Sequence, residues 1–327
     1  MAFVLRRLLH ASIVLLATGF ISFVIIRYVG DPVNNMVGQT ATLAEREAMH
    51  RALGLDDPAA AQFLRFLGNV LSGNLGVSYR YGEPVAKLIR ERAPASLELS
   101  LSAMLLAAGL GIPLGVWTAI DKGSLLTRIL LALSVVGVAL PTFLVGIVLI
   151  LVFAVNLGWL PAFGRGAVTD LGGWTTGLLT VSGLKALVLP SLTLGLFQMT
   201  LIMRLVRAEV SQVMRASFIT FAVSRGVPRR SIYFRHALGN ALLPVITIAA
   251  LQFGNVFAFS IIVETVFQWP GLGLLVIQAI QFADVPVLSA YLVLVSGVFA
   301  LLNLLVDILS PAIDPRLRDA SHQGRAA

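Results

Sequence analysis

The 327-residue chain contains no cysteine. It therefore has no disulfide framework, no thiolate metal site and no cysteine nucleophile, and cysteine usage says nothing about its redox compartment. Charged residues are also scarce, at 12% of the sequence, whereas hydrophobic residues make up 57% and the mean hydropathy is +0.90. Soluble domains carry about twice that share of charge. The composition predicts an integral membrane protein.

Sequence signatures of catalysis are missing as well. The chain has no GxxxxGK[ST] phosphate-binding loop, no HExxH zinc motif and no GxSxG nucleophile elbow. Its four histidines, His10, His50, His236 and His322, are far apart, and none has the spacing of a metal-ligand pair. We therefore expect no enzyme activity, metal site or cofactor in this chain. The net charge of +8 does not indicate nucleic-acid binding, because the basic residues lie at the edges of apolar runs.

Long apolar runs are abundant. A bilayer core about 30 Å thick needs roughly 20 apolar residues per helix. Seven runs without a Lys, Arg, Asp or Glu side chain in their interior approach or exceed this length: Leu8–Ile26, Leu99–Ile120, Ile129–Gly164, Ala186–Met203, His236–Val263, Thr265–Ala283 and Val285–Val306.

The sixth run is the exception. It contains Gln268, Gln278 and Gln281, and it is interrupted near its start by WPGLG, residues 269–273, which favours a turn. We interpret it as a loop with a short helix that lies at or in the membrane surface. Six spans remain, so the predicted fold is an all-α polytopic membrane protein with six transmembrane helices.

Basic residues in the segments beside these spans predict the orientation. With six spans, all strongly basic segments fall on one side of the membrane, which is expected to be the cytoplasm. They contain Arg6 and Arg7, Lys122 and Arg128, seven arginines from Arg204 to Arg235, and the tail residues Arg316 and Arg318. Both termini are then cytoplasmic. A seventh span would place the tail outside, so this pattern supports six.

The segment from Asp31 to Glu98 falls on the opposite side. Its seven basic and eight acidic residues are nearly balanced, so it is free to be translocated. Within it, LAEREAMHRALGL predicts an amphipathic helix that ends at Gly54, and GNLGVSYRYG, residues 73–82, predicts an ordered loop. A plain linker is the alternative, but the helical period and the aromatic content favour a small folded cap.

The predicted organisation follows from these boundaries. Residues 1–30 form the first transmembrane helix, which is too long for the apolar region of a signal peptide. Residues 31–95 form the extracytoplasmic segment, residues 96–310 a core of five transmembrane helices, and residues 311–327 a cytoplasmic tail.

A basic loop separates the fourth and fifth spans. It could be an interfacial helix whose arginines satisfy the positive-inside rule and contact anionic lipid. Against this, Phe218, Phe221 and Ala222 form an apolar face of about one helical turn, and Gly226 with Pro228 ends that turn before a second basic helix begins. This arrangement favours insertion into the groove of a partner protein.

Seven segments, in this order, resemble the membrane-spanning permease subunits of ABC importers, specifically the dipeptide/oligopeptide permease family. They are Gly30-Asp31-Pro32, LGLDDP, GNLGVSYRYGEPV, LGWLPAFG, SRGVPRRSIYFRHALGNALLP, VETVFQWPGLG and NLLVDILSPAIDPRLR, and together they extend over nearly the whole chain. The resemblance implies the type I importer permease fold, with a small extracytoplasmic segment between the first two helices.

The resemblance also implies that residues 211–240 are the family's cytoplasmic coupling loop, which contacts an ATPase. Gly226 matches the glycine of the family pattern and Ala222 its last alanine, whereas Thr220 and Phe221 replace the usual Glu and Ala. The usual proline thirteen residues after the glycine is Gly239 here. The implied coupling residues are Thr220, Phe221, Ala222, Arg225, Gly226 and Arg229.

The family mechanism implies the partners. A second permease chain, expected to differ from this one, forms the substrate path with it, two ATP-binding subunits bind ATP and Mg²⁺, and an extracytoplasmic binding protein delivers substrate. ATP binding brings the ATPases together and shifts the permeases between inward-open and outward-open states. The implied location is the cytoplasmic (inner) membrane of a bacterium or archaeon. Family members carry dipeptides, longer peptides, nickel chelates, glutathione or sugars, so the substrate stays open, with peptides favoured.

Polar side chains at membrane depth are candidates for the translocation path. They are Gln252, Asn255 and Ser260 in the fifth span and Asn303 in the last. Such residues usually face the interior of a helix bundle, where they either contact substrate or hold neighbouring helices together.

Two carboxylates near the span ends, Glu264 and Asp307, raise the rival hypothesis of a proton-coupled secondary transporter. We interpret both as solvated charges at helix ends, and no inverted repeat supports a carrier. A membrane scaffold without transport is a third alternative. Only the importer hypothesis requires two ATPases to co-purify with the chain.

Overall fold

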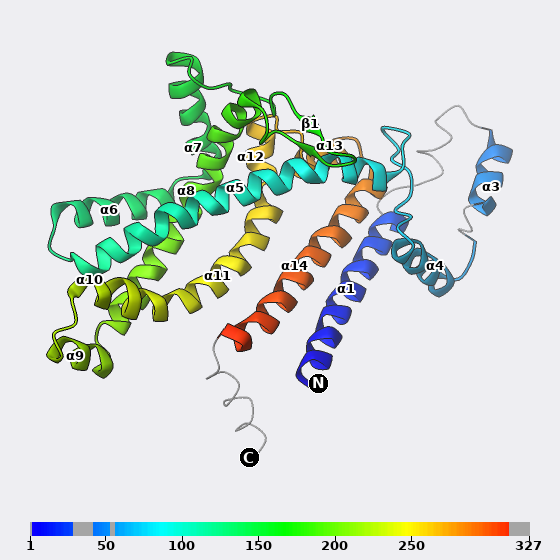
Figure 1. The fold of residues 1–327 in the computed structure, drawn as a ribbon. Coiled ribbons are helices and arrows are strands. Elements are labelled where there is room, and N and C mark those ends of the chain that lie inside the picture. Colours follow the sequence, from blue (N-terminus) through cyan, green and yellow to red (C-terminus); the bar gives the residue numbers. More distant parts are fainter. Residues whose placement is uncertain (1, 29–41, 53–55, 314–327) are drawn as a thin grey trace. The chain divides into compact units, whose positions relative to one another are not determined.

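The structure, a computed structural model, describes residues 2–28, 42–52 and 56–313. Figure 1 shows that it is built almost entirely of helices, as predicted. The α-helices are α1 (Ala2–Tyr28), α3 (Leu43–Ala52), α4 (Ala59–Leu71), α5 (Val85–Ile120), α6 (Leu125–Ala139), α7 (Thr142–Leu149), α8 (Val181–Val213), α9 (Ser217–Ser224), α10 (Arg229–Ser231), α11 (Leu238–Phe259), α12 (Ile261–Val266), α13 (Leu272–Gln281) and α14 (Val285–Ile313). Two π-helices, η1 (Ile150–Asn156) and η2 (Ile232–Ala237), adjoin α7 and α11, and two short strands, β1 (Thr169–Asp170) and β2 (Thr175–Thr176), pair before α8.

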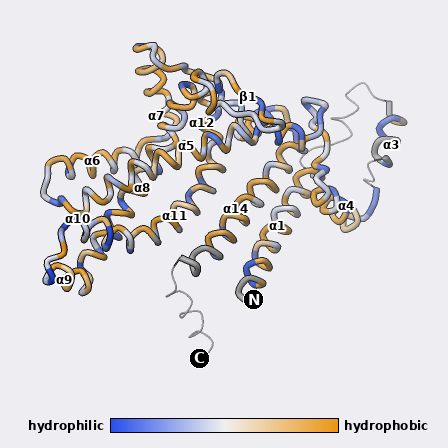
Figure 2. Tube along the Cα trace, viewed as in Figure 1, coloured by the Kyte–Doolittle hydropathy of each residue, from blue (hydrophilic) through white to orange (hydrophobic). Residues whose placement is uncertain are grey.

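Four unbroken helices are long and apolar enough to cross a membrane: Leu5–Arg27 of α1, α5, α8 and Val285–Asp307 of α14. Two bent helix pairs also qualify, so the described residues hold up to six spans if each pair is one span. Figure 2 shows hydrophobic residues along α1 and α14, whereas hydrophilic residues gather around α9 and α10 and in α3. This agrees with the six predicted spans.

The third predicted span differs from the structure. Ile129–Gly164 was expected as one continuous run, but the helices on either side of Pro141 are bent by 109° and the second ends at Asn156. Leu140 adopts an extended conformation, with ψ of 132°, because a residue before proline avoids the helical region. Gly158 and Gly164 then take positive φ angles of 64° and 81° in a loop, so the apolar run continues beyond the end of the helix.

The interpretation of Thr265–Ala283 as a non-spanning segment is confirmed. The chain turns between α12 and α13, and α13 has only ten residues, a length of about 15 Å. A helix that short cannot cross a bilayer core of about 30 Å.

The amphipathic helix that the sequence predicts between the first two spans is present as α3. Thr42 and Glu45 form a capping box, in which the Thr42 backbone N–H donates to Glu45 Oε2 at 2.8 Å and the Glu45 N–H donates to Thr42 Oγ1 at 3.3 Å. The backbone hydrogen bond from Thr42, followed by that from its hydroxyl, lowers the pKa of Glu45. The predicted end of this helix, Gly54, lies outside the described residues, as do Gly30-Asp31-Pro32, Arg316 and Arg318.

The chain divides into two compact units. The first comprises Met1–Pro94, Asp170–Thr175 and Pro270–Leu304, and the second comprises Ala95–Thr169, Thr176–Trp269 and Leu305–Ala327.

In the first unit, hydroxyl side chains join α1 to α14. Ser22 Oγ donates to the Ser289 carbonyl at 3.4 Å, and Ser289 Oγ donates to the Ser22 carbonyl at 3.2 Å. Farther along, Ser296 Oγ donates to Thr18 Oγ1 at 3.1 Å. Small hydroxyl residues of this kind allow close approach of membrane helices and bond across their interface. The end of α1 therefore meets the beginning of α14.

The loop of residues 73–82 is anchored to Asp284, which is 1% exposed. The carboxylate accepts hydrogen bonds from Ser78 Oγ and from the backbone N–H groups of Tyr79 and Arg80, at 3.2 and 3.3 Å. The Arg80 guanidinium lies 3.3 Å from the centre of the Phe282 ring. The prediction of an ordered loop is confirmed.

In the second unit, α5 and α8 approach closely through glycines. Gly111 and Gly115 are four residues apart and share one face of α5. A Cβ on Gly115 would lie 2.6 Å from Val206 Cβ and 2.7 Å from the Met203 carbonyl oxygen, and one on Gly111 would lie 2.9 Å from the Met199 carbonyl oxygen. Only glycine permits this backbone contact, which is typical of membrane helices.

Two buried carboxylates also hold the second unit together. Glu98 on α5 pairs with Arg165, whose Nε lies 3.1 Å and whose terminal nitrogen lies 2.5 Å from Glu98 Oε2. The Gly177 backbone N–H also donates to this carboxylate, at 3.3 Å. This cluster ties α5 to both ends of the segment that contains β1 and β2.

The interpretation of Glu264 as a solvated helix-end charge is wrong. Its side chain on α12 is completely buried and accepts hydrogen bonds from Ser96 Oγ at 2.6 Å and Ser260 Oγ at 3.0 Å. The sequence contains no signal for this burial, because Ser96 is 168 residues away from Glu264. A hydrogen-bonded site of this kind stabilises helix packing.

Candidate functional site

The second unit presents the candidate coupling site as a short helix between two spans. The chain leaves α8, turns at Met214–Ala216, forms the eight-residue α9 and continues into α10. Figure 1 shows α9 and α10 together at one end of α8 and α11. The helix packs against η2, and its Ile219 side chain is buried at 2% exposure. One apolar side chain therefore anchors α9, and the rest of the helix surface faces outward.

The outward surface of α9 presents the apolar face that the sequence predicted, beside the exposed hydroxyl residues Ser217 and Ser224. The Phe218 and Phe221 side chains are 45% and 59% exposed, Val223 is 57% exposed, and Ala222 is half-buried. Thr220 is exposed beside them. Exposed aromatic side chains on a helix supply large contact areas for a groove in a partner protein.

Gly226 ends α9 with a Schellman motif. Its φ angle is +73°, a left-handed conformation that glycine adopts without a Cβ penalty. The Gly226 N–H donates to the Val223 carbonyl at 3.0 Å, and the Val227 N–H donates to the Ala222 carbonyl at 3.1 Å. These two hydrogen bonds fix the direction in which the chain leaves α9, so the glycine sets the orientation of α9 relative to the helix that follows.

Arginines flank the exposed aromatic surface. The Arg225 guanidinium lies 4.7 Å from the centre of the Phe221 ring, a cation–π distance. Arg229 and Arg230 are exposed in the first turn of the next helix. The site therefore combines aromatic and cationic groups, a combination common at protein interfaces.

The site is connected to the membrane helices by a packed cluster. Ala237 and Ala241, at the beginning of the fifth span, are buried with Val206 and Val210 of α8. The fifth span bends by 48° near Pro244, which lacks a backbone N–H for the helical ladder. Side-chain packing therefore joins α9 to η2, and η2 to α8 and α11.

Three of the candidate translocation residues lie in the second unit, and the fourth lies in the first unit. Asn255 Nδ2 donates to Gln252 Oε1 at 2.6 Å, so these two share a face of α11 and are both half-buried. Ser260 is buried and donates to Glu264 and to the Phe257 carbonyl. Asn303 is exposed on α14 in the first unit. Ser260 therefore serves packing, whereas Gln252, Asn255 and Asn303 keep polar atoms at accessible surfaces.

Sequence reasoning missed the buried ion pair of Glu98 and Arg165 in the second unit. Glu98 was counted among the charges of the extracytoplasmic segment, and Arg165 was not considered. Both residues follow segments that resemble the family, but only their pairing in the structure shows that they stabilise the second unit. Within the described residues, no group of three or more His, Cys, Asp and Glu side chains could hold a metal ion.

Comparison with known proteins identifies the family. Residues 111–319 match the family described as "Binding-protein-dependent transport system inner membrane component". Residues 1–100 match a second family, which describes the N-terminal part of such membrane components. The chain belongs to this family of transport permeases. The match covers the α9 site and all candidate translocation residues.

Three relatives illustrate the similarity of this permease to others. It is 36% identical over 333 residues to the di/tripeptide transport system permease protein DppB of Pseudomonas aeruginosa, covering 97% of this chain and 99% of the relative. It is 34% identical over 331 residues to the dipeptide transport system permease protein DppB of Alkalihalophilus pseudofirmus, with the same coverage. It is 34% identical over 317 residues to the glutathione transport system permease protein GsiC of Escherichia coli, covering 97% and 98%.

The family assignment confirms the resemblance and the polytopic permease fold. The permease is a membrane-embedded transport component of a binding-protein-dependent system and not itself an enzyme. Nothing in the structure or in these similarities favours the proton-coupled alternative.

Proposed function

We propose that the permease forms half of the path by which an ATP-driven importer moves di- or oligopeptides across the inner membrane. The support for peptides as the substrate is similarity over 97% of the chain to relatives that include di/tripeptide, dipeptide and oligopeptide permeases. A similarly close glutathione permease also has a small peptide as its named substrate. Peptide amide groups suit the amide pair Gln252 and Asn255, which can donate and accept hydrogen bonds.

We infer that α9 docks into a groove of one of two partner ATPases, which bind ATP and Mg²⁺. The support is the exposed aromatic surface of α9, held by a single buried residue and by the Gly226 turn. ATP-driven closure of the ATPases pulls α9 and η2, and the cluster around Ala237 and Val210 passes this movement to α8 and α11. A second, different permease chain completes the path, and an extracytoplasmic binding protein supplies the peptide.

A pull-down combined with uptake tests this function. The tagged chain, purified from the cells in which it is made, is expected to retain two ATPases, whereas the chain alone hydrolyses no ATP because it has no phosphate loop. Peptide uptake in cells should cease when the partner ATPases are inactivated. Uptake that persists without them but stops when the proton gradient is dissipated would contradict the proposal.

The proposed orientation has both termini and the α9 site in the cytoplasm. Ser72 is exposed after α4, and Lys122 is exposed between α5 and α6. Because the chain has no cysteine, an impermeant thiol reagent should label Ser72→Cys in intact spheroplasts and Lys122→Cys only after lysis. The reverse labelling pattern would overturn the orientation and leave the family assignment intact.

A further inference from the structure

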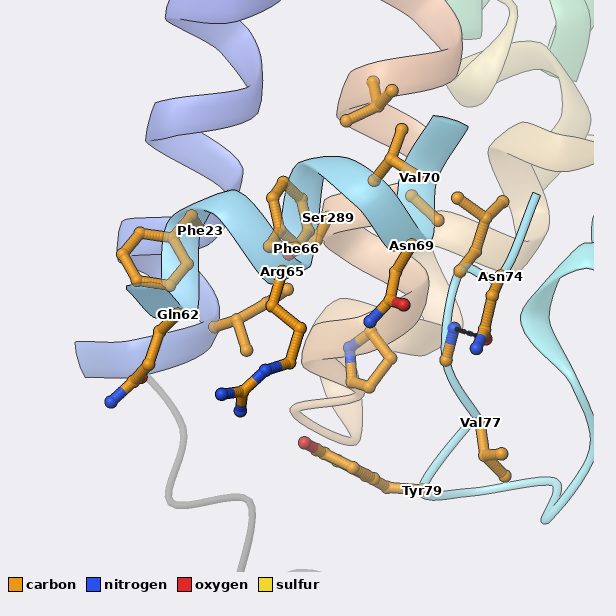
Figure 3. A pocket seen from close by; sticks show the side chains of 16 residues that line it. Phe23, Gln62, Arg65, Phe66, Asn69, Val70, Asn74, Val77, Tyr79 and Ser289 are labelled. Atoms are coloured by element: carbon orange, nitrogen blue, oxygen red, sulfur yellow. Dashed lines mark hydrogen bonds between the residues drawn. The ribbon is translucent and has the colours of Figure 1, made fainter. Parts of the chain in front are cut away.

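A cavity of about 430 Å³ opens in the first unit, and the proposed transport cycle does not use it. Figure 3 shows it beside α4, between the loop of residues 73–82 and the helices α1 and α14. We propose that this cavity is a binding site for one glycerophospholipid with a zwitterionic headgroup. Its volume lies in the range of small-molecule sites.

The position of the cavity corresponds to a boundary of the membrane. Phe23 and Ile26, in the last turns of the first span, contribute to one wall. Ser289 and Val293, in the first turns of the last span, contribute to another, and the Ser22–Ser289 hydrogen bonds hold the two span ends at the same level. A ligand there meets acyl chains on one side and headgroups on the other.

The helix α4 has the character of an interfacial helix. Its aromatic side chains pack against α1, with the Phe63 ring centre 5.5 Å from that of Phe23. Other apolar side chains remain uncovered, because Leu64 is 67% and Leu71 is 87% exposed. An amphipathic helix beside span ends, with apolar side chains uncovered, lies at the boundary between headgroups and acyl chains.

The inner wall of the cavity is apolar. It is formed by Phe23, Phe66, Val70, Ala290 and Val293, and Phe23 and Ala290 are buried. Such a wall provides no partner for a polar ligand group, and it suits an acyl chain that enters from the adjoining bilayer.

The mouth of the cavity is polar. Figure 3 shows Arg65 and Asn69 extending from the same side of α4 toward the side where Tyr79 lies. Arg65 lines the cavity and is paired with Asp57, which lies just outside the lining, and both side chains are about half exposed, at 50% and 44%. An arginine can bind a phosphate while its carboxylate partner attracts an ammonium group. The mouth therefore matches a headgroup that carries both charges, such as phosphatidylethanolamine, better than a headgroup that is only anionic.

Native mass spectrometry of the full-length chain in detergent tests the proposal. After delipidation, phosphatidylethanolamine or phosphatidylglycerol is titrated in, and binding of one molecule of phosphatidylethanolamine at lower concentration is expected. Arg65→Ala removes the phosphate partner and should weaken this binding about tenfold or more. Val293→Trp fills the space beside the apolar wall and should abolish lipid binding. The two variants together distinguish contacts to the headgroup from contacts to the acyl chain.

A matched control removes an equal charge elsewhere. Lys122→Ala lies in an exposed loop outside the cavity and should leave binding unchanged. Equal retention of lipid by the original chain, Arg65→Ala and Val293→Trp would overturn the proposal, as would preference for phosphatidylglycerol. Unchanged lipid retention with weaker docking of the binding protein to Val293→Trp would assign the cavity to that protein instead. Lipid binding is measured on the purified chain and does not depend on transport. A negative result here would therefore overturn the lipid site and leave the proposed function untouched.

Discussion

The turn at Gly226 provides the sharpest test of the coupling site. Its φ angle is +73°, and no atom lies within 4 Å of the position that a Cβ would take. A substitution there causes no collision, so its whole cost is backbone strain. For a residue with a Cβ, the left-handed conformation costs about 1–2 kcal/mol, and a β-branched side chain adds to this.

Gly226→Val should therefore shift the loop away from the conformation that presents Phe218 and Phe221. If only the native turn docks, a penalty of that size lowers the equilibrium constant for the native turn about 5–30-fold and weakens ATPase association by up to that factor. The loop lies outside the apolar spans, so insertion into the membrane should be unaffected. We expect near-normal levels in the membrane, a many-fold loss of peptide uptake and reduced recovery of ATPases in a pull-down.

Two matched variants separate strain from bulk. Gly226→Asn adds a side chain that tolerates the left-handed conformation and should retain most of the uptake. Gly239→Ala changes an exposed glycine nearby whose φ is not positive and whose Cβ would meet no atom within 4 Å, so it should be neutral. Normal uptake by Gly226→Val at equal expression, or equal loss by the Asn and Val variants, would refute the strain argument.

Two further predictions concern helix packing and use thermal unfolding of the purified chain. Gly115→Val forces a Cβ to within 2.6 Å of Val206 Cβ and should lower the unfolding temperature strongly, whereas Gly109→Ala on the same helix meets no atom within 4 Å and should not. Removing one partner of the buried pair, as in Glu98→Leu or Arg165→Met, should cost about 3–5 kcal/mol, because the remaining charge is buried alone. The double variant should be more stable than either single one, and additive losses would contradict this reasoning.

Much of the transport architecture could be predicted from local sequence patterns. The apolar runs indicated the spans, and WPGLG indicated the interruption that separates α12 from α13. The sequence around Gly226 predicted a short helix with an apolar face that ends at the glycine, and the structure contains it. These features depend on residues within one or two helical turns of each other, which a linear pattern records.

Other features could not be predicted, because they depend on segments brought together by folding. The hydrogen bond from Ser96 to Glu264 joins residues 168 positions apart, and the pair of Glu98 and Arg165 joins residues 67 positions apart. In the sequence, Glu98, Arg165 and Glu264 are ordinary helix-end or loop charges, and Ser96 is an ordinary hydroxyl. Burial and pairing follow from the packing of distant helices, and no short-range pattern encodes that packing.

The bend near Pro141 lies between these two cases. Proline predicts a local break, but hydropathy continues across it, so the apolar run from Ile129 to Gly164 indicates one span. The angle of 109° depends on how α7 packs against α8 and α12. Composition and periodicity therefore specify which segments enter the membrane, whereas side-chain contacts between distant segments specify how those helices bend and which polar groups become buried.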